Sequence, residues 1–217
     1  MGNPCPVGEA VKVWGLDTEG ETMARLAPLD EHEWTDKARQ AISPTIQSVA
    51  AMLGDEQVTR PERKKPLNIL LTLAHNDQLI GPFLQWAGAL AVHGALDRRD
   101  AELLALRAAW NCRSEFEWGH HVEYAEHFGL RRDEIDRVPH GADAPGWMPH
   151  QAALLRAADE LHSATLISDA TYAELASVFN PAQLIELVMT VGQYTMLSMV
   201  ANSFEVAMEP GLEPLPS

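Results

Sequence analysis

The sequence predicts an all-α protein folded as a helical bundle, and two observations carry that prediction. Apolar residues recur three and four positions apart through most of the chain, as they do on one face of a helix. Helix-start and helix-stop signals punctuate this pattern, whereas no stretch alternates apolar and polar residues as a half-buried strand would. At 217 residues, the chain is long enough to bury one substantial core.

The first half of the chain is expected to hold an extended arm followed by helices. Residues 1–28 contain Gly and Pro without a sustained period, which is typical of an arm. Ser43 and Pro44 match an N-cap followed by proline at the first helical position, so a helix is predicted to begin there. The charged segment 60–66 has two prolines and indicates a connector. Helical spacing continues through 67–75 and 77–94.

Helix boundaries are clearer in the second half. Asp97 can cap a helix over 98–111, and Ser114 can cap the next helix, which Gly129 would end. Further helices are predicted over 131–138, 150–164, 168–179 and from Asn180-Pro181 to about Met208. The expected organisation is therefore an arm (1–28), one helical domain (29–208) and a Pro-rich tail (209–217).

Composition and charge exclude several classes of function. Asp and Glu outnumber Lys and Arg by 31 to 16, and the net charge of −15 disfavours nucleic acid and anionic membranes as partners. Two cysteines without metal-type or redox-type spacing, and no visible secretory signal, predict a reducing, cytoplasmic location. The longest apolar run, 187–204, contains Gln193 and Asn202, so we expect a buried helix or subunit interface, not a membrane span.

Titratable side chains are concentrated in the segment "CRSEFEWGHH", residues 112–121. On a helix that starts near Ser114, Glu117 and His121 are one turn apart on the same face, and Tyr124 continues that face. A carboxylate beside an imidazole can orient it and move protons near neutral pH. His120 falls on a different side, so the two adjacent histidines are not expected to serve one site.

Other roles for these residues compete with proton transfer. Ser114 and Glu117 fit a capping box, in which the glutamate would satisfy the N-cap amide, and His121 could pack against Trp118. Cys112 could be reactive at a helix N-terminus, but no second cysteine lies near it to form a redox pair. A metal site from His120, Glu123 and His127 lacks a recognised zinc motif, and a solvated helix face is the alternative. We expect no metal.

Two segments of the chain show a weak internal repeat. Glu102 lies twelve residues before Ser114, and Glu186 lies twelve residues before Ser198. The second copy has no counterpart to the pair formed by Glu117 and His121. Periodicity alone places Glu102 at the surface, as is usual for a charged side chain.

Beyond these patterns, the stretch from Leu67 to Leu130, with its "CRSEFEW" and His121, resembles the alkylhydroperoxidase D-like, carboxymuconolactone decarboxylase superfamily. The resemblance is greatest to the longer single-chain members and extends from about residue 26 to the tail. It implies an AhpD-like bundle with a helical hairpin core. It also implies homo-oligomers whose pockets often lie near subunit interfaces.

The superfamily pattern also implies a set of site residues. Its peroxidase branch uses a glutamate, a Cys-x-x-Cys and a histidine four residues later, which fall here on Glu102, Ser114, Glu117 and His121. Both cysteines are replaced, so a dithiol cycle cannot run at these positions. The glutamates and the histidine that remain are similar to the site residues of the decarboxylase branch. That branch uses acid–base residues without a cofactor.

The expected function is therefore cofactor-independent acid–base catalysis, as decarboxylation or a related proton transfer, on a small organic acid, lactone or enol. Glu102, Glu117 and His121 are the expected catalytic residues, with Cys112, Ser114 and Tyr124 as further candidates. Alternatives are a thiol peroxidase that uses Cys112 and a non-catalytic helical oligomer that at most binds a ligand. Candidates to line the pocket are Tyr124, Gln193, Tyr194 and Asn202, and candidate cations for an acidic substrate are Lys37, Arg107 and Arg113.

Overall fold

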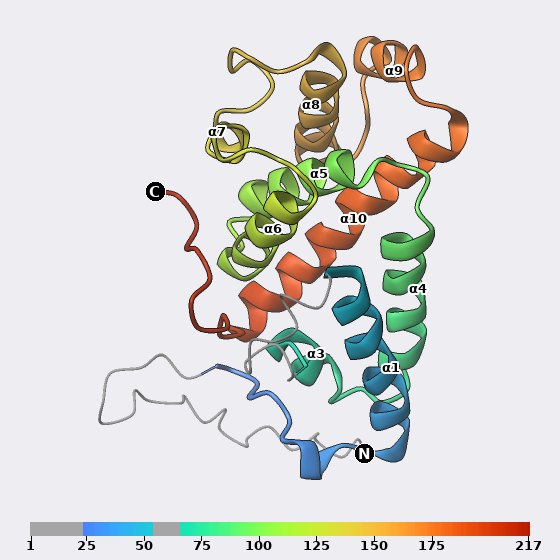
Figure 1. Cartoon of the computed structure of the whole chain (residues 1–217), viewed down its shortest axis with the longest axis vertical. Helices are drawn as coiled ribbons and strands as arrows, with labels where there is room; N and C mark the ends of the chain where they lie inside the picture. Colours follow the sequence, from blue (N-terminus) through green and yellow to red (C-terminus); the bar gives the residue numbers. More distant parts are fainter. Residues whose placement is uncertain (1–23, 54–65) are drawn as a thin grey trace, which may run out of the picture.

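The computed structural model describes residues 24–53 and 66–217, and within these residues it is helical without a strand (Figure 1). Most of the predicted arm and connector lies outside the described residues. The elements are η1 (Glu31–Glu33), α1 (Asp36–Leu53), α3 (Asn68–Leu73), α4 (Ile80–His93), α5 (Arg98–Asn111), α6 (Glu115–His127), α7 (Arg132–Ile135), η3 (Val138–His140), α8 (Pro149–Ala164), α9 (Asp169–Ala176) and α10 (Pro181–Phe204). The all-α prediction is confirmed.

Helix α5 is the centre of the bundle and packs against α6, α8 and α10. It begins as predicted, because the Asp97 side chain accepts a hydrogen bond from the Arg99 backbone N–H at 2.9 Å. The main core forms around it from side chains with 0–1% exposure, which include Leu104, Leu106, Trp118, Leu154, Leu155 and Leu187. This packing fixes α5 and α6 side by side (Figure 1).

The predicted helix start at Ser43-Pro44 is wrong. Helix α1 begins at Asp36 and runs through Pro44. The Thr35 hydroxyl, not Ser43, provides the cap by accepting from the Ala38 N–H at 3.2 Å. Ala38 and Ile42, one turn apart and both fully buried, then hold this first part of α1 against α4. Tertiary packing of these two residues outweighs the local cost of an internal proline.

Helix α10 ends four residues earlier than predicted, at Phe204, where Glu205 adopts a left-handed conformation with φ of 53°. The tail then crosses α6. Its Arg132–Glu213 ion pair and the packing of Leu215 on the main core hold it in place. By length and composition α10 is the one helix in the described part of the chain that could cross a membrane, a test that core helices also pass.

Candidate active site

A cavity of about 500 Å³ lies between α4, α5, α6 and α10. Helices α5 and α6 bring Glu102, Glu117 and His121 to its wall, with exposures of only 2–4%. The opposite wall, on α4, consists largely of small and aliphatic residues, with Gly88 among them. A concave pocket of this size with a few convergent polar groups is the usual form of a small-molecule site.

His121 lies between the two glutamates. Its Nδ1 is 2.6 Å from Glu102 Oε2, and its Nε2 is 3.7 Å from Glu117 Oε2. A carboxylate oxygen only accepts, so the Nδ1–H donates to Glu102 and the lone pair is left on Nε2. The imidazole therefore presents a base to the side where Glu117 lies. With one nitrogen directed to each acid, the three residues do not offer ligand atoms that converge on one point.

Glu102 is buried, and the surface position expected from periodicity is wrong. Arg98, one turn earlier on α5, donates from Nη2 to Glu102 Oε1 at 3.1 Å, while His121 takes the other oxygen. The two hydrogen bonds compensate the carboxylate for the loss of water. The i,i+4 spacing of Arg98 and Glu102 is a sequence signal for this ion pair, although the role of Arg98 was not predicted.

The predicted capping box between Ser114 and Glu117 does not form completely. Ser114 accepts from the Glu117 N–H at 3.4 Å, which is half of the box. The other half is blocked, because the Ser114 N–H already donates to Ala109 O at 3.0 Å in the turn that ends α5. The Glu117 carboxyl is thereby left to the cavity. Burial raises its pKa above the ordinary value, although His121 and His120 oppose the shift.

Two tyrosines pack edge-on against the His121 ring, Tyr194 at 4.2 Å and Tyr124 at 5.4 Å between centroids. Both line the cavity, as does Gln193. Burial and the nearby Glu102 and Glu117 raise the pKa of the Tyr194 hydroxyl well above its usual range. The Tyr194 hydroxyl therefore keeps its proton and can only act as a neutral hydrogen-bonding group at ordinary pH.

His120 also lines the cavity, contrary to the expectation that the adjacent histidines would serve different places. Its Nδ1–H donates to Phe116 O at 2.8 Å, and its Nε2 lies 2.8 Å from Glu209 Oε2 in the tail. Burial opposes the charge of Glu209, but the contact with His120 outweighs it and lowers the pKa of that carboxyl. The cavity covers enough of the α6 surface to include two positions about 100° apart.

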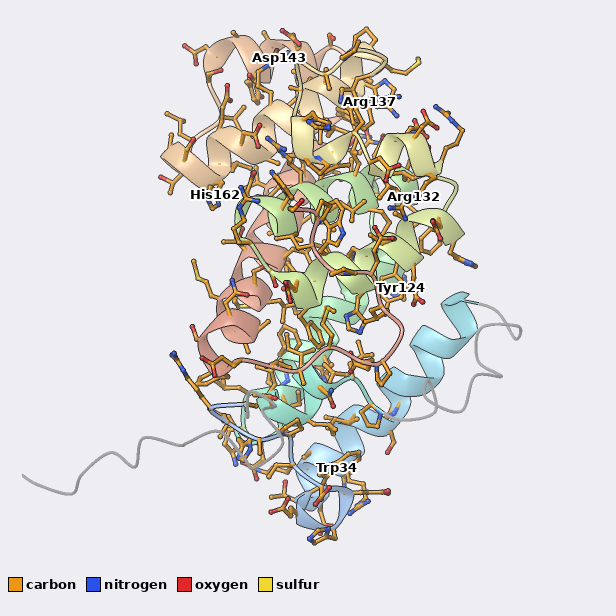
Figure 2. The ribbon with its side chains drawn as sticks, turned by 90° about the vertical axis from the view of Figure 1, so that its left-hand side faces the viewer. Trp34, Tyr124, Arg132, Arg137, Asp143 and His162 are labelled. Carbon is orange, nitrogen blue, oxygen red and sulfur yellow. The ribbon has the colours of Figure 1, made fainter. Side chains whose placement is uncertain are left out.

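Cys112 lies away from this cavity. Its Sγ is 3.8 Å from His162 Nδ1 on α8, and Figure 2 shows His162 well separated from Tyr124, which lines the cavity. Burial raises the pKa of the Cys112 thiol, against hydrogen bonds with Thr195 and Ser198. A raised pKa disfavours the thiolate that a peroxidase needs.

Several other predicted residues also lie elsewhere. The Asn202 side chain is exposed and donates to Cys112 O at 2.9 Å. In the second copy of the weak internal repeat, the Glu186 carboxylate accepts from the Ala95 and Leu96 backbone N–H groups rather than from a histidine. The cations expected for an acidic substrate do not line the cavity. Lys37 bonds Gln78, Arg107 pairs with Asp159, and Arg113 stacks on Trp110.

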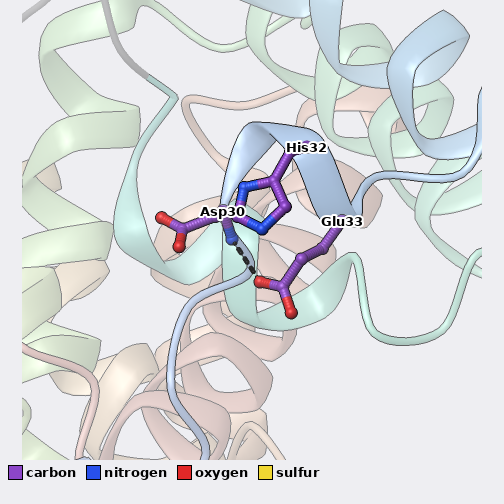
Figure 3. A group of neighbouring side chains, drawn as sticks. All are labelled: Asp30, His32 and Glu33. Atoms are coloured by element: carbon purple, nitrogen blue, oxygen red, sulfur yellow. Dashed lines mark hydrogen bonds between the residues drawn. The ribbon is translucent and has the colours of Figure 1, made fainter.

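Among the described residues, one group of three side chains is close enough to share a metal ion: Asp30, His32 and Glu33 (Figure 3). All three are exposed, and the Glu33 carboxylate accepts from the Asp30 N–H at 2.9 Å. The cluster is thus the cap of η1. His120, Glu123 and His127, which were considered as ligands, form no such group.

Comparison with known proteins gives the class of the molecule. Its fold is shared with an alkylhydroperoxidase AhpD-core, peroxidase-related protein from Ralstonia eutropha JMP134 (TM-score 0.71, 17% identity, 88% of this chain and 94% of that one). It is shared also with the debrominase Bmp8 in complex with 2,3,4-tribromopyrrole (TM-score 0.68, 15% identity, 85% and 91%). A peroxidase-related protein from Silicibacter sp. TM1040 is similar as well (TM-score 0.63, 15% identity, 83% and 96%). These likenesses show an AhpD-like fold.

Part of the sequence also matches a known family. Residues 83–160, from α4 into α8, match the carboxymuconolactone decarboxylase family. No curated protein shows detectable sequence similarity to the chain. The family match includes all of α5 and α6, which carry the two glutamates and His121. The match covers the same helices that carry the resemblance to the alkylhydroperoxidase D-like, carboxymuconolactone decarboxylase superfamily in the sequence.

Proposed function

We propose that this protein is a cofactor-independent enzyme that moves protons on a small oxygenated compound, in decarboxylation or a related reaction of an organic acid, lactone or enol. The observation that carries the proposal is the series Arg98, Glu102, His121 and Glu117 at the cavity wall, in which the last three are buried. It holds a base, His121 Nε2, beside a carboxyl whose raised pKa lets it act as an acid.

The proposed step for a lactone or ketone needs only protons. His121 Nε2 takes the proton from the carbon next to the carbonyl, and the C–H electron pair becomes a C=C bond. The carbonyl oxygen takes the proton of the Glu117 carboxyl and becomes an enol hydroxyl. Return of the His121 proton to a conjugated carbon, and of the enol proton to Glu117, completes an isomerisation. Glu102 stabilises the intermediate imidazolium through Nδ1–H.

The position of Cys112 supports proton transfer over thiol peroxidase chemistry, because Cys112 is not among the residues that line the cavity. A debrominase of the same fold supports the more general idea that this bundle can house enzymes with small organic substrates. At 15% identity that chemistry is not carried over to this chain.

The test is proton exchange from candidate lactones and keto acids in D₂O, followed by NMR. His121→Ala and Glu117→Gln should each lower the exchange rate by about 10²-fold or more, as is typical for general acid–base groups. Cys112→Ser should retain the rate. Full activity in both cavity variants, or loss in Cys112→Ser alone, would reject the mechanism.

We also propose that the chain forms a homo-oligomer through α10. Ile185, Met189, Gly192, Met196 and Met199 are exposed and follow a spacing of four, three, four and three. That spacing is the seam of a helix pair, and a two-fold axis would place the same stripe of a second copy against it.

A further inference from the structure

We infer that the cavity selects neutral substrates, such as lactones, enols and esters, and discriminates against free carboxylates. The inference rests on the proposed function and narrows it to proton transfer on substrates without a negative charge, which disfavours decarboxylation of a free organic acid. It starts from the charges that the described residues place around the cavity.

Arg98 is the only Lys or Arg among the described residues that line the cavity. Its guanidinium is already used within the protein. Nη2 donates to Glu102 at 3.1 Å, Nη1 donates to Ala91 O at 2.9 Å, and the group lies 4.8 Å above the Phe128 ring. A substrate carboxylate near Arg98 would share this cation with Glu102, so the attraction available to the substrate is weaker than that of an unpaired guanidinium.

The other charged groups at the wall do not attract an anion. Glu102 is acidic, and Glu117 becomes negative when it ionises. A second imidazole, that of His120, already has a carboxylate beside it, with its Nε2 2.8 Å from Glu209 Oε2. His93, the last residue of α4, also lines the cavity, but it lies at the exposed end of that helix. A carboxylate bound beside His121 would meet two acids and no uncommitted Lys or Arg on the described wall. Like charges within a few ångströms repel one another.

The rest of the wall suits an uncharged, largely apolar molecule. Ile69, Leu70, Phe83, Leu84, Leu90 and Leu197 contribute aliphatic and aromatic surface. Gln193 on α10 accepts from Trp86 Nε1 at 2.8 Å through its oxygen. Besides the acid–base groups, the polar lining includes the uncharged amides and hydroxyl of Gln85, Gln193 and Tyr194, which suit a carbonyl or hydroxyl.

The experiment compares matched pairs of compounds that differ only in charge. Each pair sets a neutral methyl ester against its free carboxylate, with the methyl ester of carboxymethyl-substituted α-angelica lactone against the free acid as the first pair. Binding is measured as the ligand-dependent shift of the melting temperature, and turnover as proton exchange in D₂O. Neutral members should bind and exchange at least about tenfold better than their carboxylates.

A pair of variants tests whether the lack of an available cation on the wall causes the discrimination against carboxylates. Leu90, half-buried on the α4 wall, is replaced by Lys to add a cation or by Met to change only the shape. Leu90→Lys should improve carboxylate binding by up to about fivefold, as expected for a partly solvated ion pair, while Leu90→Met should not. Both variants are compared with the wild-type protein for folding by circular dichroism.

The outcomes separate the two proposals. Carboxylates that bind as well as, or better than, their neutral partners would overturn the inference, as would a panel in which no neutral member binds. Neutral members that bind but exchange no protons, or exchange them at the same rate in His121→Ala, would reject the proposed function and leave the charge selection standing.

Discussion

The hydrogen bond between Glu102 and His121 is the contact whose loss is most informative. Glu102→Gln keeps the shape of the side chain but replaces a charged acceptor by an amide. The 2.6 Å contact is a short, charge-assisted hydrogen bond in a buried place. Such bonds contribute about 1.5–3 kcal/mol. If that energy holds the base-competent tautomer and stabilises the imidazolium, the rate should fall roughly 10- to 150-fold, at tenfold per 1.36 kcal/mol.

The assay measures both the exchange rate and the position of the proton on the His121 ring. Proton exchange of a neutral lactone gives the rate, and the ¹⁵N shifts of the His121 ring report which nitrogen carries the proton. The Gln variant should show a lower rate together with a changed tautomer population. An unchanged rate with the proton still on Nδ1 would refute the argument that Glu102 positions the base.

Glu186→Gln is the matched control. Glu186 is also a buried glutamate twelve residues before a buried serine, but its carboxylate accepts from the backbone N–H groups of Ala95 and Leu96. The change removes the same charge outside the cavity. It should lower the free energy of unfolding, because those N–H groups lose a charged acceptor, and leave the exchange rate and the His121 tautomer unaltered.

Three further predictions address the acid, the cavity and the oligomer. Burial raises the pKa of Glu117, so its ionisation costs stability only as the pH rises above the unfolded-state value. Glu117→Gln should therefore stabilise the protein more at pH 8 than at pH 4 in urea denaturation, and a gain independent of pH would contradict this. An added Cβ at Gly88 meets no atom within 4 Å, so Gly88→Ala should stabilise α4 by about 0.5–1 kcal/mol without loss of ligand binding. Gly88→Phe should fill the cavity and abolish binding, and equal binding by both variants would place the ligand elsewhere. Met196→Glu with Met199→Glu should lower the mass in sedimentation, whereas a monomeric wild-type protein would refute the α10 interface.

Local signals predicted most of the helices because the signals and the structure depend on the same few residues. Asp97 caps α5 through an N–H two residues away, and Asn180 caps α10 in the same way. Ser43 and Pro44 carried an equally good local signal and were misleading. The difference lies in Ala38 and Ile42, whose burial against another helix cannot be read from the residues around Pro44.

In the candidate site too, some residues could be predicted from local spacing and others depend on tertiary packing. Glu117 and His121 lie one turn apart, so helical spacing alone predicted that they would share a face. Glu102 and the contact of His120 with Glu209 depend on how α5 and the tail lie against α6, which no local pattern specifies. The resemblance to the superfamily pattern predicted Glu102 as a site residue, whereas the roles of Arg98 and the tail were not predicted.

The short connection between α5 and α6 explains how a residue with a capping signature becomes a site residue. Arg113 adopts a left-handed conformation with φ of 53°, and the N–H groups of Arg113 and Ser114 donate to Trp110 O and Ala109 O. This is a Schellman motif, and it consumes the N–H that the Glu117 carboxyl would otherwise cap. The motif that ends α5 therefore frees Glu117 for the cavity. The connection it forms is short enough to set α6 directly beside α5, where His121 meets Glu102.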